Sequence, residues 1–156
     1  MNVHYLNTDL EIESKDDVSQ IVDEFGDDII VLHHGEMRGY QHASFSIAGG
    51  SSDADATINI FCTLVEQLPK DIRQIWDGCC SRLFDIGYES GTSPQSFRSE
   101  IRAATIQRVA KIGAGMIVTI YPETDESPST RATSLAGEPV IQCATADARR
   151  PGGTSV

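Results

Sequence analysis

The chain has 156 residues, of which 40% are hydrophobic and 6% aromatic, and its formal net charge at pH 7 is −11. This length predicts a single domain that buries a core without help from disulfides or metal. The negative charge repels a phosphate backbone, and no stretch approaches the roughly 20 apolar residues that span a bilayer, so neither nucleic acid nor a membrane is an expected partner.

The first predicted elements are a strand and a helix. Alternating apolar positions indicate a strand within residues 3–14. Four apolar residues then recur at helical spacing, which predicts a short helix with Ser14 as its N-cap and Gly26 just after its end. These four residues are Val18, Ile21, Val22 and Phe25.

Two predicted strands, residues 28–34 and 40–49, come next and form a β-hairpin around the loop GEMRG. After the next Gly/Ser-rich stretch, apolar residues at helical spacing predict a helix that starts near Ser52 and stops at Pro69. Pro69 also suits the first position of a second helix, PKDIRQIWDGCC.

The last predicted elements are a strand within residues 81–90, a helix within 98–113 and a strand within 115–122. The resulting order, β-α-β-β-α-α-β-α-β, predicts an α+β fold: a ferredoxin-like mixed or antiparallel sheet with helices packed on one face. We expect residues 1–122 to form this single domain. Residues 123–156 are dominated by Ser, Thr, Ala, Gly and Pro, which predicts a disordered, low-complexity tail.

The stretch WDGCCSRLFDIGYESGTSPQSF, the helix after it and the segment VAKIGAGMIVTIYP resemble an uncharacterised bacterial family, a domain of unknown function. The shared pattern is an FDIG strand followed by a glycine, then a helix and a last strand that ends in TxYP. The resemblance covers about residues 3–122 and implies a protein of the immunity or mobile-cassette kind. Its motifs are structural, so it implies no active residues.

Charge is unevenly distributed along the chain. Residues 1–66 hold 13 acids against Lys15 and Arg38, whereas residues 67–121 hold five acids against seven bases. A dense acidic surface attracts basic proteins and speeds their association, and an aromatic side chain adds close packing. We therefore predict that a basic protein partner docks on seven residues: Asp16, Asp17, Asp23, Glu24, Asp27, Asp28 and Tyr40.

The predicted hairpin offers an alternative site. His34 and His42 would meet across the hairpin, and Glu36 would complete a metal-ligand set with zinc as the expected ion. His33 would point to the opposite face, because successive side chains on a strand alternate. This alternative predicts a small metal-dependent or ligand-binding enzyme.

Other groups with catalytic chemistry do not form a recognisable site. Asp85 and Glu89 would project from one face of their strand, about 13 Å apart at ~3.3 Å per residue, which is too far for shared acid–base chemistry. No GxSxG motif occurs. The four cysteines lack CxxC spacing and are expected to be reduced thiols.

The sequence thus predicts a small acidic protein-binding module without catalytic residues or cofactor, of the immunity or mobile-element accessory type. A cytoplasmic location is expected, because the N-terminus lacks the basic and apolar regions of a secretory signal. Two alternatives stay open. One is the enzyme centred on the histidine hairpin, and the other is a structural homodimer held by charge complementarity between its acidic and basic halves.

Overall fold

The computed structural model describes residues 2–93 and 95–123. The predicted tail therefore lies outside the described residues, except for Glu123. None of the helices in these two ranges is both long and apolar enough to cross a bilayer.

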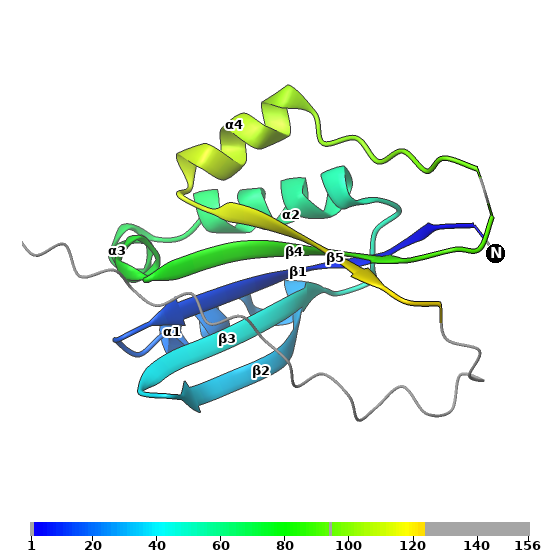
Figure 1. The fold of residues 1–156 in the computed structure, drawn as a ribbon. Coiled ribbons are helices and arrows are strands. Elements are labelled where there is room, and N and C mark those ends of the chain that lie inside the picture. Colours follow the sequence, from blue (N-terminus) through cyan, green and yellow to red (C-terminus); the bar gives the residue numbers. More distant parts are fainter. Residues whose placement is uncertain (1, 94, 124–156) are drawn as a thin grey trace, which may run out of the picture.

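A five-stranded mixed sheet forms the centre of the fold (Figure 1). Its strands lie in the order β2-β3-β1-β4-β5, and all neighbours are antiparallel except β4 and β5, which are parallel. The first four strands with α1 and α2 form the βαββαβ unit of a ferredoxin-like fold, and β5 adds a strand beside β4. The predicted α+β fold is confirmed. The strands are β1 (His4–Ser14), β2 (Ile29–Met37), β3 (Tyr40–Ile47), β4 (Ser81–Glu89) and β5 (Gly115–Tyr121).

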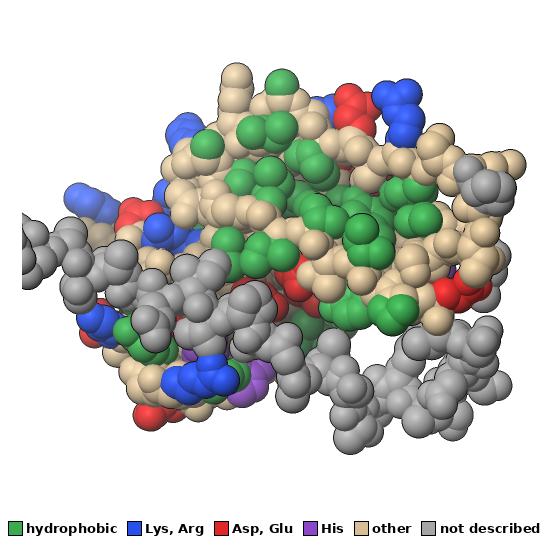
Figure 2. Space-filling view, in the orientation of Figure 1, with side chains coloured by type: hydrophobic (Ala, Val, Ile, Leu, Met, Phe, Trp, Pro, Cys, Tyr) green, Lys and Arg blue, Asp and Glu red, His purple; other side chains and the backbone are tan. Residues whose placement is uncertain are grey.

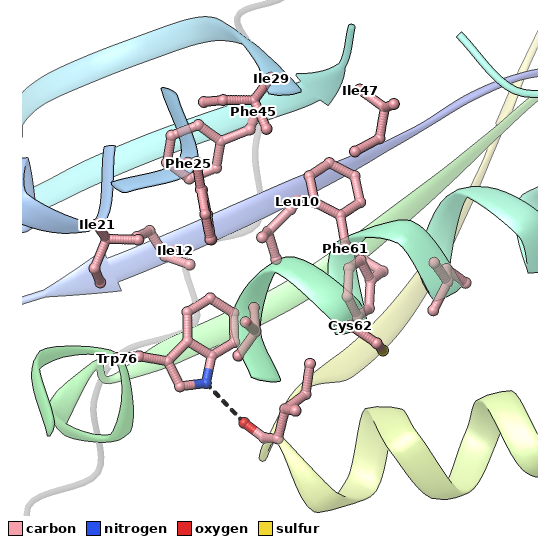
Figure 3. Packing of buried hydrophobic residues seen from close by; sticks show 14 of the residues in the cluster. Leu10, Ile12, Ile21, Phe25, Ile29, Phe45, Ile47, Phe61, Cys62 and Trp76 are labelled. Atoms are coloured by element: carbon pink, nitrogen blue, oxygen red, sulfur yellow. Dashed lines mark hydrogen bonds between the residues drawn. The ribbon is translucent and has the colours of Figure 1, made fainter. Parts of the chain in front are cut away.

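The core lies between the sheet and its helices. Alternate residues of the three central strands point toward the helices, as the period of two requires. The ring of Phe25 on α1 meets Phe45 of β3 edge to face, with the centroids 5.5 Å apart (Figure 3). Phe61 of α2 packs on Phe84 of β4 at 5.8 Å. The helices of the described chain are α1 (Ser19–Phe25), α2 (Ala54–Glu66), α3 (Lys70–Gly78) and α4 (Ala103–Lys111), with a 3-10 turn at Gly26–Asp28.

Trp76 connects α3 to the C-terminal part of the domain. Its indole is fully buried and donates a hydrogen bond of 2.8 Å to the carbonyl of Ile112, directly after α4 (Figure 3). The guanidinium of Arg82 on β4 donates to the carbonyls of Trp76 and Gly113. The turn between α4 and β5 is therefore fixed to α3 by one hydrogen bond and to β4 by another, and the local sequence reveals neither.

Two helices are shorter than their sequence patterns predict. The helix α1 begins at Ser19, because Asp17, and not the predicted cap Ser14, accepts hydrogen bonds from the amide and hydroxyl of Ser19. The helix α4 begins only after Arg102, whose backbone is extended. Asp55 of α2 accepts a hydrogen bond of 2.9 Å from the Arg102 amide, so a contact distant in sequence sets this helix start.

The hairpin turn is tighter than the predicted five-residue loop. The strands β2 and β3 extend until only Arg38 and Gly39 remain between them. Both turn residues have positive φ, 55° and 85°, as a type I′ hairpin turn requires. This tight turn fixes the register of the whole hairpin.

Asp55 is a buried carboxylate on which the α2–α4 contact depends. Burial alone would raise its pKa, but hydrogen bonds from Thr105 and Arg102 and the charge of Arg102 hold the pKa below its usual value. We predict that Asp55→Ala lowers the free energy of unfolding by about 2–3 kcal/mol at pH 7, because these hydrogen bonds are lost.

The pH dependence of this loss follows from the lowered pKa. The stabilisation by Asp55 is present above the pKa of the unfolded chain, about 3.9, and is lost as the pH falls through the lower pKa of the folded state. Urea unfolding at pH 7 and pH 3 measures both effects. The exposed Glu100→Ala is the matched control, and an equal loss in the two variants would contradict this role of Asp55.

Candidate binding site on the open face of the sheet

The side of the sheet opposite the core carries a row of acids. On β1, Leu10 and Ile12 point into the core, so Asp9, Glu11 and Glu13 point to the other side. No described helix packs on this side, which we call the open face. Its acidic residues, on β1 and β4, are Asp9, Glu11, Glu13, Asp85 and Glu89.

Two of these acids face each other at the centre of the sheet. Asp9 of β1 and Asp85 of β4 are direct cross-strand partners. Asn7 donates a hydrogen bond of 2.8 Å to Oδ2 of Asp9, and Thr119 of β5 donates one of 2.6 Å to Oδ1 of Asp85. Like charges directly opposite each other on neighbouring strands repel, so this pair costs folding free energy.

Of the two acids, Asp9 has the less favourable environment for a charged carboxylate. Its Oδ1 atom is buried and accepts no hydrogen bond from the described residues. Burial raises the pKa of Asp9 from 3.8 to about 6, and the negative charge of Asp85 adds to this rise, whereas the nearby Ser46 hydroxyl offsets it in part. The Asp9 carboxylate is therefore poorly compensated at neutral pH.

The two ends of the open face carry acid–histidine pairs. His42 lies 3.0 Å from Glu13, with the distance measured between Nε2 and Oε2, and His4 lies 3.3 Å from Glu89. Glu13 is only 8% exposed, and its second oxygen is buried with no hydrogen-bond donor in the described chain. A histidine ring therefore lies against a carboxylate at each end of the acidic row.

Gly87 lies on β4 close to the two central acids and next to the side chain of Asn7. It lies opposite Asn7 on β1, where a bulge shifts the register. A Cβ atom at Gly87 would lie 2.7 Å from Oδ1 of Asn7, closer than real contacts allow. Gly87 thus leaves room for the end of the Asn7 side chain, which in turn hydrogen-bonds Asp9.

The predicted docking residues are divided by the sheet. All six of the predicted acids are exposed, on α1 and its flanks on the helix side of the sheet: Asp16, Asp17, Asp23, Glu24, Asp27 and Asp28. Tyr40 shares the strand parity of His42 and so belongs to the open face. These residues do not form one surface, because α1 lies behind the sheet from the open face (Figure 1). Their role in binding stays a prediction.

A shallow depression of about 620 Å³ lies beside two of these acids. Asp27 and Asp28 line it together with Gly49, Gly50 and Leu64. The glycines could present amides to an anion, but the two carboxylates oppose one. The depression therefore lacks the chemistry of a phosphate site.

The predicted metal ligands do not converge. The register pairs His34 with Ala43 and Gly35 with His42, so His34 and His42 lie on opposite faces of the hairpin. Glu36 shares the face of His34, and no group of three potential metal ligands occurs among the described residues. The cause is the two-residue turn, because a slip of one residue moves every side chain to the other face.

Asp85 and Glu89 do project from the same face, as predicted, but each has its own neighbours. Of the cysteines in the described chain, Cys62 and Cys79 are free and buried, and burial raises the pKa of each thiol to about 11. Cys80 is disulfide-bonded, so the expectation of a reduced thiol is wrong for this residue. None of these groups is poised as a nucleophile.

No protein-family model matches this chain, and no curated protein or solved structure shows significant similarity to it. The resemblance to a bacterial family of unknown function accordingly stays a prediction.

The charge pattern of the sequence indicated an acidic site on α1 and did not reveal the pair of Asp9 and Asp85. The alternation along β1 was a usable signal for Asp9, whereas its pairing with Asp85 depends on strand order.

We predict that Gly87→Ala destabilises the protein by only about 0.5–1 kcal/mol, because the flexible end of the exposed Asn7 side chain must move away from the new methyl group. The move also breaks the hydrogen bond from Asn7 to Asp9, so the pKa of Asp9 rises further. Thermal unfolding and an NMR titration of Asp9 measure the two effects. In the control Gly35→Ala, the nearest side-chain atom lies 3.9 Å away, and an equal destabilisation there would contradict the steric argument.

Proposed function

We propose that this protein is a small protein-binding module that docks a basic segment of a partner on the open face of its sheet. The pair of Asp9 and Asp85 carries the proposal. Two carboxylates that oppose each other at the centre of a sheet, one of them with a buried oxygen that accepts no hydrogen bond from the described residues, repel each other until a cation lies between them.

The donors around the pair favour an organic cation over a free metal ion. Asn7 and Thr119 already donate to one oxygen of Asp9 and one of Asp85, so few lone pairs converge on a common point. Divalent cations such as Ca²⁺ need six or more oxygen ligands. A planar guanidinium can instead bridge two carboxylates with parallel hydrogen bonds, which supports arginine as the central contact.

The acids on α1 support the same function from a distance. Asp16, Asp17, Asp23 and Glu24 are exposed and add to the negative field of the molecule. Such a field speeds the approach of a basic partner but contributes little to the affinity of the final complex. A basic effector neutralised by a protein of the immunity type is one partner with this chemistry, in line with the resemblance in the sequence.

We predict that Asp9→Asn weakens binding of an arginine-rich peptide about tenfold and at the same time stabilises the free protein. The amide cannot pair with a guanidinium, but it no longer repels Asp85. After allowance for solvent screening, the gain is about 1–2 kcal/mol at pH 7.5. Fluorescence anisotropy of a labelled peptide and thermal unfolding measure the two changes.

Asp23→Asn on α1 is the matched control, since it removes one exposed charge without touching the sheet. It leaves the stability unchanged and weakens binding only at low salt, because exposed charges are screened. Equal losses of affinity in the two variants at high salt would contradict docking on the open face.

The raised pKa of Asp9 predicts a pH dependence. Protonation of Asp9 stabilises the fold, an effect fully present below the pKa of the unfolded chain and lost as the pH rises through about 6. The unfolding free energies of the wild type and Asp9→Asn therefore differ at pH 7.5 and converge near pH 4. The peptide affinities of the two proteins converge by pH 5, where about a tenth of Asp9 is charged.

His4 and His42 are present in both proteins, so they do not affect the difference between them. Isothermal titration calorimetry at four pH values measures this difference directly. A gap in affinity that stays constant from pH 7.5 to pH 5 would mean that the charge of Asp9 does not act in binding.

A further inference from the structure

A second surface of the molecule is apolar and exposed. Met116, Val118 and Ile120 of β5 are 39%, 59% and 65% exposed, and Phe97 and Ile106 nearby are exposed as well. Figure 2 shows hydrophobic side chains gathered between α4 and β5. We call these five residues the β5 patch. The patch is separate from the open face, so its role is independent of the proposed function.

The β5 patch lies on the helix side of the sheet. The parallel register pairs Met116, Val118 and Ile120 with Phe84, Ile86 and Tyr88, which are all buried. Strand β5 thus repeats the apolar pattern of its buried neighbour, although nothing in the described chain covers it. A strand with this pattern is typical of a buried position.

The position of α4 explains why the patch is uncovered. Arg108 of α4 forms an ion pair with Glu66 of α2, and Thr105 accepts a hydrogen bond from Asn59 of α2. The helix is therefore held beside α2 (Figure 1) and leaves the side chains of Met116, Val118 and Ile120 exposed. The contacts that fix α4 are polar and specific, so a shift of α4 onto β5 would break them.

Strand β5 is also open at its edge. Within the described ranges it pairs only with β4, so its outward backbone amides and carbonyls lack partners in the sheet. Its sequence, GMIVTIY, contains no charge, proline or bulge, the features that protect edge strands from pairing.

We propose that β5 pairs antiparallel with β5 of a second copy of this chain and so forms a continuous ten-stranded sheet across a two-fold axis. With Val118 on the axis, Val118 meets its own counterpart, and Met116 meets Ile120 of the other copy. Each exposed apolar residue of β5 then packs against another, and the two α4 helices flank the joint. An isologous contact of this kind closes with two copies and forms no fibre.

Charge favours a second copy at this edge. The strand order places β5 at the opposite edge from β2, on the far side of β1 from the acidic segment at α1. Residues 67–121, which include β4, α4 and β5, carry five acids and seven bases. Two chains of net charge −11 therefore meet where they repel each other least.

The other edge of the sheet is a poorer place for two copies to meet. Ile30 and Leu32 on β2 are exposed too, but β2 has a bulge near Val31 and ends beside Glu36. It also comes directly after the acids Asp27 and Asp28. Bulges and charges of this kind block edge pairing.

Sedimentation of the full chain tests the proposal. We expect a dimer at micromolar concentration, and we expect Val118→Lys to raise its dissociation constant on the order of a hundredfold, because two lysines would meet on the axis. Ile30→Lys, at a similarly exposed apolar position on the other edge, leaves the dimer intact. A monomeric wild type, or a dimer lost in Ile30→Lys but kept in Val118→Lys, would overturn the proposal.

A cross-link tests the register independently of any loss of folding. Val118→Cys places two thiols on the two-fold axis, within disulfide reach for cross-strand neighbours. Mild oxidation then converts most of this variant into a covalent dimer, whereas Ile30→Cys stays largely monomeric on a denaturing gel. Equal cross-linking of the two variants would exclude the β5 pairing.

Discussion

The alternation of side chains along β1 is the constraint on which this structure depends. β1 is the central strand and is antiparallel to both neighbours, so every residue of it except Leu6, at the bulge, has a cross-strand partner. Leu10 and Ile12 join the core, and the alternating acids Asp9, Glu11 and Glu13 join the open face. A shift of register by one residue on β1 would bury carboxylates in the core, and the hydrophobic effect therefore fixes the face on which the acids lie.

The same alternation explains how far the fold could be predicted from the sequence. The order and types of the elements could be predicted from local periodicity, as could the sheet with helices on one face. The start of α4 could not, because Asp55 determines it from another helix. The faces on which His34 and His42 lie could not be predicted either, since the register depends on whether two or five residues form the turn. The pairing of Asp9 with Asp85 needed the strand order, which no local pattern contains.

The open face couples a proposed function to a cost in stability. Asp9 would be better compensated as an amide, and Gly87 leaves room for Asn7 at the expense of backbone order in the strand. Natural proteins accept such costs at sites of function. Thr119 extends the arrangement to β5, since its hydroxyl holds Asp85. The edge strand that carries the β5 patch thus also supports the central acids, although on its opposite face.

Trp76 has a further practical consequence. It is the single tryptophan of the chain, and its indole is bound to the carbonyl that closes α4. Its emission therefore reports on whether the C-terminal helix and strand are docked. Detachment of this unit would admit water to the indole, and the emission would shift to longer wavelength while the βαββαβ unit was still folded. Fluorescence and far-ultraviolet circular dichroism would then follow different transitions, and their comparison would resolve the two parts of the domain.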